Sequence, residues 1–308
     1  MHNRVLNFEQ IEHFKEWGWV KVEQAFPRET AVSCQQFLWE KLRERGVLQE
    51  DPSSWTKPMI YIQEAYRSPE FDQCNTLRMA NAIEELIGKE RWTDKGVYGI
   101  DEIHSTWGWW PVNFALGAEQ EWTVPTEGWH WDGIHFRHYV DSPEQGLLCL
   151  CLFSEIAPRG GGTLVLEGSH KLVARFLAQH PQGLESQAAI DALNMQHPYL
   201  AQLTGIASGQ HASTAEARIH TFMNTLHRDS EGIQLRVIET TGSPGDVILC
   251  HPFLYHTASP NHNGVPRFMC NRTTPLKERM NLNRDDPRDY SPLEMSIRQA
   301  LSDRETTS

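Results

Sequence analysis

The chain has 308 residues, enough for one large domain or two modest ones, and its formal net charge is −12 at pH 7. This acidic balance argues against a nucleic-acid partner, which requires clustered Lys and Arg. No apolar run reaches the length of a membrane span, and the N-terminus lacks a basic segment followed by an apolar one. We therefore expect a cytoplasmic protein without a membrane partner; the sequence does not indicate its oligomeric state.

The first hundred residues predict mixed helix and strand. Asn7 can cap a helix, with Gln10 in the position that closes a capping box. A short strand over residues 19–22 follows, and Pro27 then opens a helix that continues to about residue 45. The apolar side of that helix contains Val32, Leu38 and Leu42. Another helix is expected over about 77–87, ending at Gly88.

From about residue 97 the pattern changes to short β-rich stretches separated by turns, which is typical of a β-sandwich or jelly roll. The run 146–154 is apolar on both faces, as expected for a central strand. The predicted strands cover residues 112–116, 146–154, 163–166, 235–239, 246–250 and 267–273. We expect one domain over residues 1–308, with a helical N-terminal part over about 1–96.

A helical insert is predicted between the strands, over about residues 169–230. Ser169 can cap its first helix, and two more are expected over 188–193 and 215–223. Such an insert either covers the core or closes over an active site. Near the end of the chain, Ser291-Pro-Leu-Glu294 has the pattern of a capping box with proline at the first helical position.

The six cysteines are scattered along the chain. Cys149 and Cys151 share one face of a strand-like run, but a single pair at this spacing is weak evidence for zinc. We expect all six to be free thiols, as in a reducing compartment.

The motif Gly128-Trp-His-Trp-Asp-Gly133 provides two candidate metal ligands. At a strand end, residues i and i+2 point the same way, so His130 and Asp132 can reach one ion. Two imidazoles and one carboxylate can occupy one face of a ferrous ion and leave the other positions open for substrates and O2. A second triplet, His227-Arg-Asp229, lies in a polar stretch where we expect an exposed loop.

His251 and His256 compete to be the third ligand. Five residues apart on a strand, they face opposite sides, so only one is expected to join the metal. We favour His256 because Arg267 follows on what should be the adjacent strand. The planar fork of an arginine can grip one carboxylate of a dicarboxylate co-substrate with two hydrogen bonds. His251 is then expected to be structural.

The order of these motifs, with Gly161-Gly-Thr-Leu-Val-Leu-Glu-Gly-Ser-His170 and Gly245-Asp-Val-Ile-Leu249 between them, resembles the phytanoyl-CoA dioxygenase family. The segment Phe8–Val20 is similar to the opening helix and strand of that family. The resemblance implies a mainly β fold with flanking helices, namely a double-stranded β-helix (a cupin-like jelly roll). It also implies that His130, Asp132 and His256 bind Fe(II), and that Arg267 holds the distal carboxylate of 2-oxoglutarate.

The resemblance suggests further contacts to the co-substrate. A small hydroxyl residue often assists the arginine two positions after the second histidine; this chain has Ala258 there, with Thr257 and Ser259 on either side, and Thr257 is the candidate contact. Cys151, in the strand before the glycine-rich turn, is expected to face the 2-oxoglutarate pocket. Trp131 either flanks the co-substrate or packs in the core.

The implied reaction is the O2-dependent hydroxylation, or a related oxidation, of an unactivated C–H bond in a small molecule, with release of succinate and CO2. Asp132 argues against halogenation, because related halogenases have a small residue in its place. Arg137, His135 and His138 suggest an anionic substrate. Two alternatives stay open: a non-catalytic ligand-binding protein that retains the fold, and a cupin-like metalloenzyme that does not use 2-oxoglutarate.

A cluster of tryptophans fits either a substrate platform or the jelly-roll core, and we expect the core. Its members are Trp107, Trp109, Trp110, Trp122 and Trp129.

Overall fold

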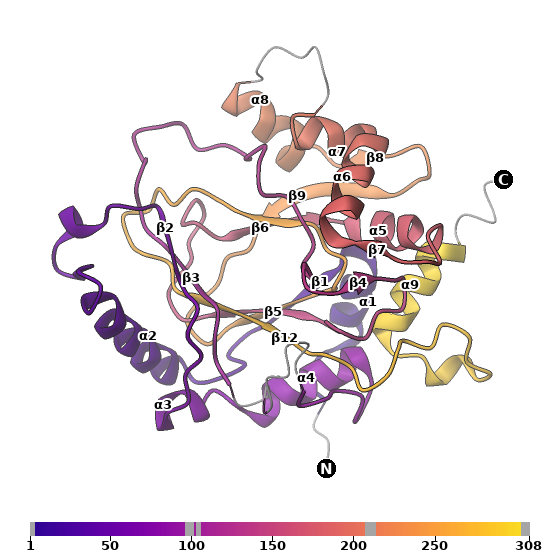
Figure 1. The fold of residues 1–308 in the computed structure, drawn as a ribbon, viewed down its shortest axis with the longest axis horizontal. Helices are drawn as coiled ribbons and strands as arrows, with labels where there is room; N and C mark the ends of the chain where they lie inside the picture. The colour runs from indigo at the N-terminus through magenta and orange to yellow at the C-terminus, as the bar shows by residue number, and fades with distance from the viewer. Residues whose placement is uncertain (1–3, 96–101, 103–105, 207–213, 303–308) are drawn as a thin grey trace.

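Two four-stranded antiparallel sheets form the centre of the molecule (Figure 1). The computed structural model describes residues 4–95, 102, 106–206 and 214–302. The first sheet has the order β1 (Trp19–Val22), β10 (Val247–Cys250), β5 (Leu148–Leu152) and β12 (Met269–Thr273). The second has the order β11 (His256–Ala258), β6 (Thr163–Glu167), β9 (Gln234–Glu239) and β8 (His227–Arg228).

Two further strands extend the first sheet beyond β12. β2 (Met59–Ile62) pairs with β3 (Trp110–Asn113), and β3 lies beside the segment that leads into β12. There the Asn113 nitrogen donates to the Arg267 carbonyl at 3.0 Å, and the Arg267 nitrogen donates to the Asn113 carbonyl at 2.8 Å. A small separate pair joins β4 (Arg137–His138) to β7 (Leu184–Glu185).

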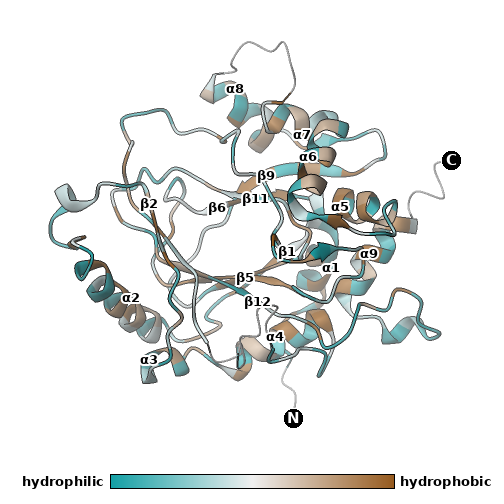
Figure 2. Cartoon of the chain, viewed as in Figure 1, coloured by the Kyte–Doolittle hydropathy of each residue, from teal (hydrophilic) through white to brown (hydrophobic). Residues whose placement is uncertain are grey.

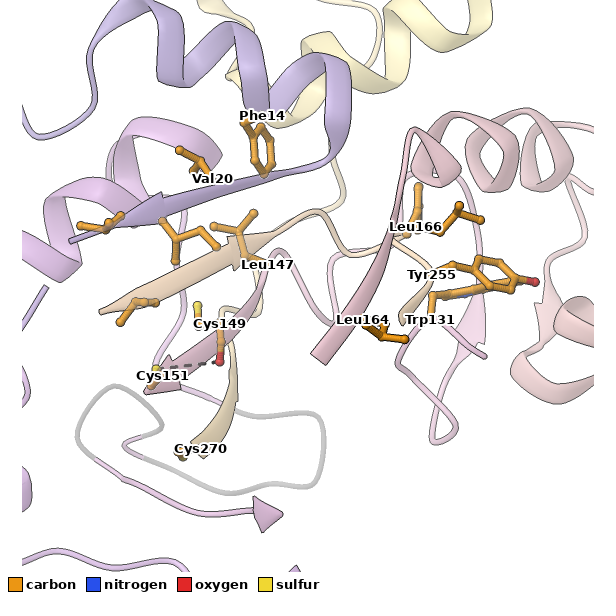
Figure 3. Packing of buried hydrophobic residues seen from close by; sticks show 14 of the residues in the cluster. Phe14, Val20, Trp131, Leu147, Cys149, Cys151, Leu164, Leu166, Tyr255 and Cys270 are labelled. Carbon is orange, nitrogen blue, oxygen red and sulfur yellow. Dashed lines mark hydrogen bonds between the residues drawn. The ribbon is translucent and has the colours of Figure 1, made fainter. Parts of the chain in front are cut away.

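The interior between the two sheets is a compact apolar cluster. Every second residue of each strand belongs to this cluster, because successive side chains in a strand point to opposite faces. Its members include Leu148, Leu150, Leu152, Val165, Ile248, Cys250 and Met269. The residues between them on β5 and β12 face the other way, so that Cys149, Cys151 and Cys270 join a second, larger cluster (Figure 3).

The N-terminal helices begin and end close to the predicted residues. Helix α1 (Phe8–Trp17) has the expected capping box, in which Asn7 and Gln10 bond each other's backbone nitrogen. The other helices of this part are α2 (Arg28–Arg43), α3 (Pro69–Asp72) and α4 (Leu77–Ile87). Helix α2 shows both hydrophobic and hydrophilic residues in Figure 2. Leu38 and Leu42 are buried, but the prediction for Val32 is wrong, since this side chain is 47% exposed.

The predicted insert is helical and lies along the second sheet (Figure 1). It contains α5 (Ser169–Ala178), α6 (Ser186–Gln196), α7 (Pro198–Leu203) and α8 (Ala215–Ile219). Helix α5 packs against the C-terminal helix α9 (Pro292–Ser302), where the Arg175 Nε donates to the Ala300 carbonyl at 2.7 Å. The capping box before α9 is present: the Glu294 nitrogen donates to the Ser291 hydroxyl, and the Ser291 nitrogen to the Glu294 carboxylate.

The predicted description as mainly β needs correction. Helices hold more of the described residues than strands do, because the N-terminal part and the insert are both helical. Short helical turns add the segments Pro52–Ser54, His220–Asn224 and Pro287–Asp289. Over the described ranges, no helix combines the length and apolar composition needed to cross a bilayer. The six cysteines are buried free thiols, as predicted.

Candidate metal centre and co-substrate site

The structure brings His130, Asp132 and His256 together. His256 begins β11, and its backbone pairs with that of His130 in an isolated antiparallel bridge. Directly opposed residues of such a pair present their side chains on the same face, and the two ring centroids are 4.4 Å apart. The Asp132 Oδ1 lies 3.3 Å from the His130 Nε2 and 3.7 Å from the His256 Nε2. One ligand atom from each residue falls within 4.8 Å of the others.

Backbone carbonyls set which nitrogen of each imidazole is available. The His130 Nδ1 lies 2.7 Å from the Gly128 carbonyl oxygen, and the His256 Nδ1 lies 3.0 Å from that of Leu254. A carbonyl can only accept, so both Nδ1 atoms carry the hydrogen, and in the neutral form of each ring the Nε2 keeps a lone pair. The lone pairs are on the nitrogens that approach Asp132. This is the usual arrangement of metal-binding histidines, whose other nitrogen is held by a backbone carbonyl or carboxylate.

The charges of the three groups also suit a cation. Burial acts to raise the pKa of Asp132, but His256 and His130 outweigh it and lower that pKa below its usual value. Burial lowers the pKa of His256, and the neighbouring His130 lowers it further. Asp132 raises the pKa of His130 against the effect of burial. At neutral pH the site therefore holds an ionised carboxylate and at least one neutral imidazole, the forms that bind metals.

Arg267 is buried, and no carboxylate among the described residues forms an ion pair with it. Its side chain is 1% exposed, and its Nη1 and Nη2 approach the sulphurs of Met269 at 3.3 Å and Met59 at 4.0 Å. Within the part of the chain that the structure describes, its Nε has no hydrogen-bond partner. Burial lowers the pKa of Arg267 to about 10, so the guanidinium remains charged at neutral pH. A buried charge without a partner is costly, which indicates a place for an anionic ligand.

Cys151 does not face Arg267, and the expectation that it lines the co-substrate pocket is corrected. In the register of β5 with β12, Cys151 is opposite Cys270, while Leu152 is opposite Met269. Met269 contacts Arg267 in the interior between the sheets, so Cys151 lies on the other face. Its thiol contacts the Cys149 carbonyl, as Figure 3 shows. Because successive side chains of a strand point to opposite faces, a shift of one residue along β5 is enough to move a side chain from one face of the sheet to the other.

Trp131 packs in the core, which was one of its two predicted roles. Its side chain is fully buried, and its ring lies 5.3 Å from that of Tyr255 (Figure 3). The Trp131 Nε1 donates to the His138 Nδ1 at 3.2 Å. Trp131 belongs to the larger apolar cluster, whereas the side chains of His130 and Asp132 on either side of it contact each other.

Thr257 holds the metal-binding loop. Its hydroxyl donates to the Glu127 carbonyl at 3.2 Å, on the face of β11 opposite to His256. Gly128 approaches the same hydroxyl: a Cβ added at this glycine would lie 2.8 Å from the Thr257 Oγ1, and its φ is +78°. A side chain at position 128 would therefore force apart the loop and the strand that bring the two histidines together.

The competing candidates lie outside the triad. His251 is buried, and its Nδ1 accepts from the Phe253 nitrogen at 3.1 Å. In the second His-x-Asp triplet, Asp229 pairs with the His197 Nε2 at 3.3 Å and accepts from the Ile233 nitrogen at 2.8 Å. Most residues of the segment 224–232 are exposed, as expected for this loop, although the Asp229 side chain itself is only 5% exposed.

The side chains expected to attract an anionic substrate have other partners. Arg137 is exposed and donates to the Glu185 carboxylate and to the carbonyls of Gln182 and Gly183. His138 is buried, and burial lowers its pKa, so it is neutral at pH 7.

Sequence analysis missed the neighbours of Arg267. Met59 lies 208 positions away in the chain, and no local pattern connects the two residues.

No protein-family model matches this chain, and no curated protein matches it. Among solved structures, the non-heme α-ketoglutarate-dependent carbocyclase SnoK from nogalamycin biosynthesis aligns with a TM-score of 0.50 at 14% identity, over 86% of this chain and 82% of that one. This likeness is one of fold. EctD from S. alaskensis, crystallised with 2-oxoglutarate and 5-hydroxyectoine, has a TM-score of 0.46 at 16% identity, over 89% and 78% of the two chains.

Proposed function

We propose that this chain is an Fe(II)- and 2-oxoglutarate-dependent oxygenase. It would hydroxylate, or otherwise oxidise, an unactivated C–H bond of a small molecule and release succinate and CO2. The observation that carries the proposal is the convergence of two imidazole Nε2 atoms and one carboxylate oxygen within 4.8 Å. Nitrogen and oxygen donors in this combination are typical of non-heme iron sites with open positions.

His130, Asp132 and His256 would hold the iron. Their Nε2 and Oδ1 atoms are oriented by backbone contacts that exist without an ion, so binding requires little rearrangement. When bound, the iron and 2-oxoglutarate would supply the oxidising chemistry, in which one atom of O2 enters succinate and the other enters the substrate in a hydroxylation or leaves as water in a desaturation.

Arg267 would bind the distal carboxylate of 2-oxoglutarate. A carboxylate at its guanidinium would replace weak contacts to two methionine sulphurs by charge-assisted hydrogen bonds. This requirement favours the oxygenase over a cupin-like metalloenzyme without 2-oxoglutarate, which has no need for a buried cation that awaits an anionic ligand. A complete ligand set likewise favours an enzyme over a binding protein that only retains the fold.

Two resemblances support the proposal. The motif order resembles the phytanoyl-CoA dioxygenase family, and SnoK, whose fold this chain shares, is described as α-ketoglutarate dependent. Neither identifies the substrate. Retention of Asp132 as a ligand favours hydroxylation or a related oxidation over halogenation.

Succinate release tests the proposal. Purified protein with Fe(II), 2-oxoglutarate and a metabolite extract should form succinate and a product 16 mass units heavier than its precursor or two units lighter, depending on whether the reaction is hydroxylation or desaturation. Both signals should require O2. Formation of neither product nor succinate by folded, iron-loaded protein across diverse extracts would contradict it.

A further inference from the structure

Trp109 behaves differently from the other tryptophans of its cluster. The core prediction is confirmed for four of them, which are buried: Trp107, Trp110, Trp122 and Trp129. Trp109 is 44% exposed, and so is wrongly assigned to the core. Tyr61 is 50% exposed, and its ring centroid lies 5.5 Å from that of Trp109 at an interplanar angle of 33°.

The register of the extended sheet places this pair on the face that carries Arg267. On β2, Ile60 and Ile62 pack in the larger cluster, so Met59 and Tyr61 point the other way. Met59 contacts the Arg267 guanidinium, so Met59 and Tyr61 lie on the face of the sheet that carries the proposed co-substrate site. The contact between the two rings puts Trp109 on the same side.

Trp109 is held in a backbone conformation that bulky residues seldom adopt. Its φ is +62°, in the left-handed region, and its carbonyl accepts from the Asn271 nitrogen at 3.1 Å. Strained positions of this kind cluster at ligand-binding and active sites, because the surrounding structure must hold them in place. Here the strain orients a large ring toward solvent beside Tyr61, although burial would be the more stable position for an indole.

Asn271 adds a polar group without a partner. On β12 it alternates with Cys270 and Arg272, and therefore faces the same side as Met269 and Arg267. Its Oδ1 is buried, and no group among the described residues donates a hydrogen bond to it. Buried amide oxygens are rarely left without a donor, which suggests that a ligand supplies one.

We propose that Tyr61 and Trp109 bind the ring of the substrate and that the Asn271 Oδ1 accepts a hydrogen bond from it. This inference rests on the proposed function and defines a substrate class: a small molecule with a neutral planar ring that bears an N–H or O–H donor. Offset or tilted aromatic faces favour ring stacking over binding of flexible chains.

The surrounding side chains support a neutral ring. Met59, Pro111 and Met269 lie on the same face as the aromatic pair and Arg267. They offer apolar surface, so an ionic group placed there would lose hydration without a partner. The charge of Arg267 would be used by the co-substrate.

The test uses protein labelled with 5-fluorotryptophan and loaded with Zn(II) and 2-oxoglutarate, observed by fluorine NMR. The Trp109 resonance is assigned with Trp109→Phe. The probes are indole, 1-methylindole (a ring without a donor) and 1-octanol (an acyclic molecule of similar size). Indole should shift the Trp109 resonance saturably, 1-methylindole should bind about two- to tenfold more weakly, and 1-octanol should leave that resonance in place.

Two variants and one control make the result specific. Tyr61→Ala should abolish the indole-induced shift, and Asn271→Ala should remove the difference between indole and 1-methylindole. Phe8→Ala, which removes another exposed ring, should change neither. Three results would overturn the proposal. They are octanol that binds as tightly as indole, an indole-induced shift that persists in Tyr61→Ala, and a Trp109 shift that depends on the protein concentration and not on the indole concentration. Repeating the titration without Zn(II) and 2-oxoglutarate separates failure of this subsite from failure of the co-substrate site.

Discussion

His130 and His256 are joined backbone to backbone, with each nitrogen donating to the carbonyl of the other residue at 3.1 and 2.8 Å. The two residues are distant in sequence, and this bridge places their imidazoles side by side. Asp132 follows His130 by two residues, and its Oδ1 lies 3.3 Å from the His130 Nε2. The pairing therefore creates the ligand set before any ion binds.

The two His-x-Asp triplets give a matched test of the metal site. His130→Ala should lower Fe(II) affinity more than about 100-fold, since even loss of a group that only orients a ligand costs about 10- to 100-fold. His227→Ala, which removes the histidine of the other triplet, should bind iron as the unmodified protein does, because His227 stacks on Tyr199 outside the triad. Anaerobic equilibrium dialysis measures both. Equal losses in the two variants would mean that the triad is not the site.

Arg267→Leu should separate stability from co-substrate binding. The variant should need at least about 30-fold more 2-oxoglutarate, since losing one partner of a buried charge pair costs roughly 2 kcal/mol or more. Without ligand, it should be as stable as the parent or more so, because leucine beside Met59 and Met269 replaces an unpaired buried charge.

Urea unfolding of the ligand-free proteins and 2-oxoglutarate titration of the iron-loaded ones would check both halves of this prediction. Retained co-substrate affinity would assign the anion to another cation. A large drop in ligand-free stability would mean that the guanidinium has a partner in the protein.

Trp131→Phe tests whether this residue contacts the co-substrate. The variant loses the hydrogen bond from the Trp131 Nε1 to His138 and should be about 1–3 kcal/mol less stable, since a buried acceptor is left without a donor. Its affinity for 2-oxoglutarate should stay unchanged, because the ring packs on Tyr255 and away from the ligand atoms. A weaker affinity with unaltered stability would favour the co-substrate contact instead.

Two buried histidines outside the site predict a loss of stability in acid. Burial lowers the pKa of His170 to about 3 and lowers that of His251 well below its ordinary value. Both are neutral in the folded protein, whereas the unfolded chain takes up protons below a pKa of about 6.5. The free energy of unfolding should therefore fall as the pH drops from about 6.5, by up to about 1.4 kcal/mol per pH unit for each histidine.

His170→Gln isolates one of these contributions. Urea unfolding of metal-free protein at a series of pH values should show a slope lower by about 1.4 kcal/mol per pH unit in the variant. An unchanged slope would show that His170 is accessible to protons in the folded state.

Much of the fold follows from local patterns in the sequence. The capping boxes at Asn7 and Ser291, and the glycine after α4, mark helix ends through contacts within one turn, and the structure has them where predicted. The spacing of His130 and Asp132 is also a local pattern. Residues two positions apart along an extended chain lie on the same face, so the spacing predicts that both side chains can reach one ion.

The errors concern features that depend on distant residues. Cys151 was placed on the wrong face because the phase of β5 is set by its pairing with β10 and β12, which no local spacing records. The loop around Asp229 is exposed as predicted, but the pairing of Asp229 with His197 joins residues 32 positions apart, which no local pattern indicates. Trp109 is exposed where its neighbours are buried, and it has a positive φ, which the residue type does not predict.

Visible absorption of anaerobic protein most directly tests the claim that three side chains and one arginine form an iron and 2-oxoglutarate site. Adding Fe(II) and then 2-oxoglutarate should give a saturable charge-transfer band at one equivalent of each per chain. The band should be lost in His256→Ala, and in Arg267→Leu it should require far more 2-oxoglutarate. A folded protein that gives no band at saturating concentrations of both, or a His256→Ala variant that keeps it, would contradict the account.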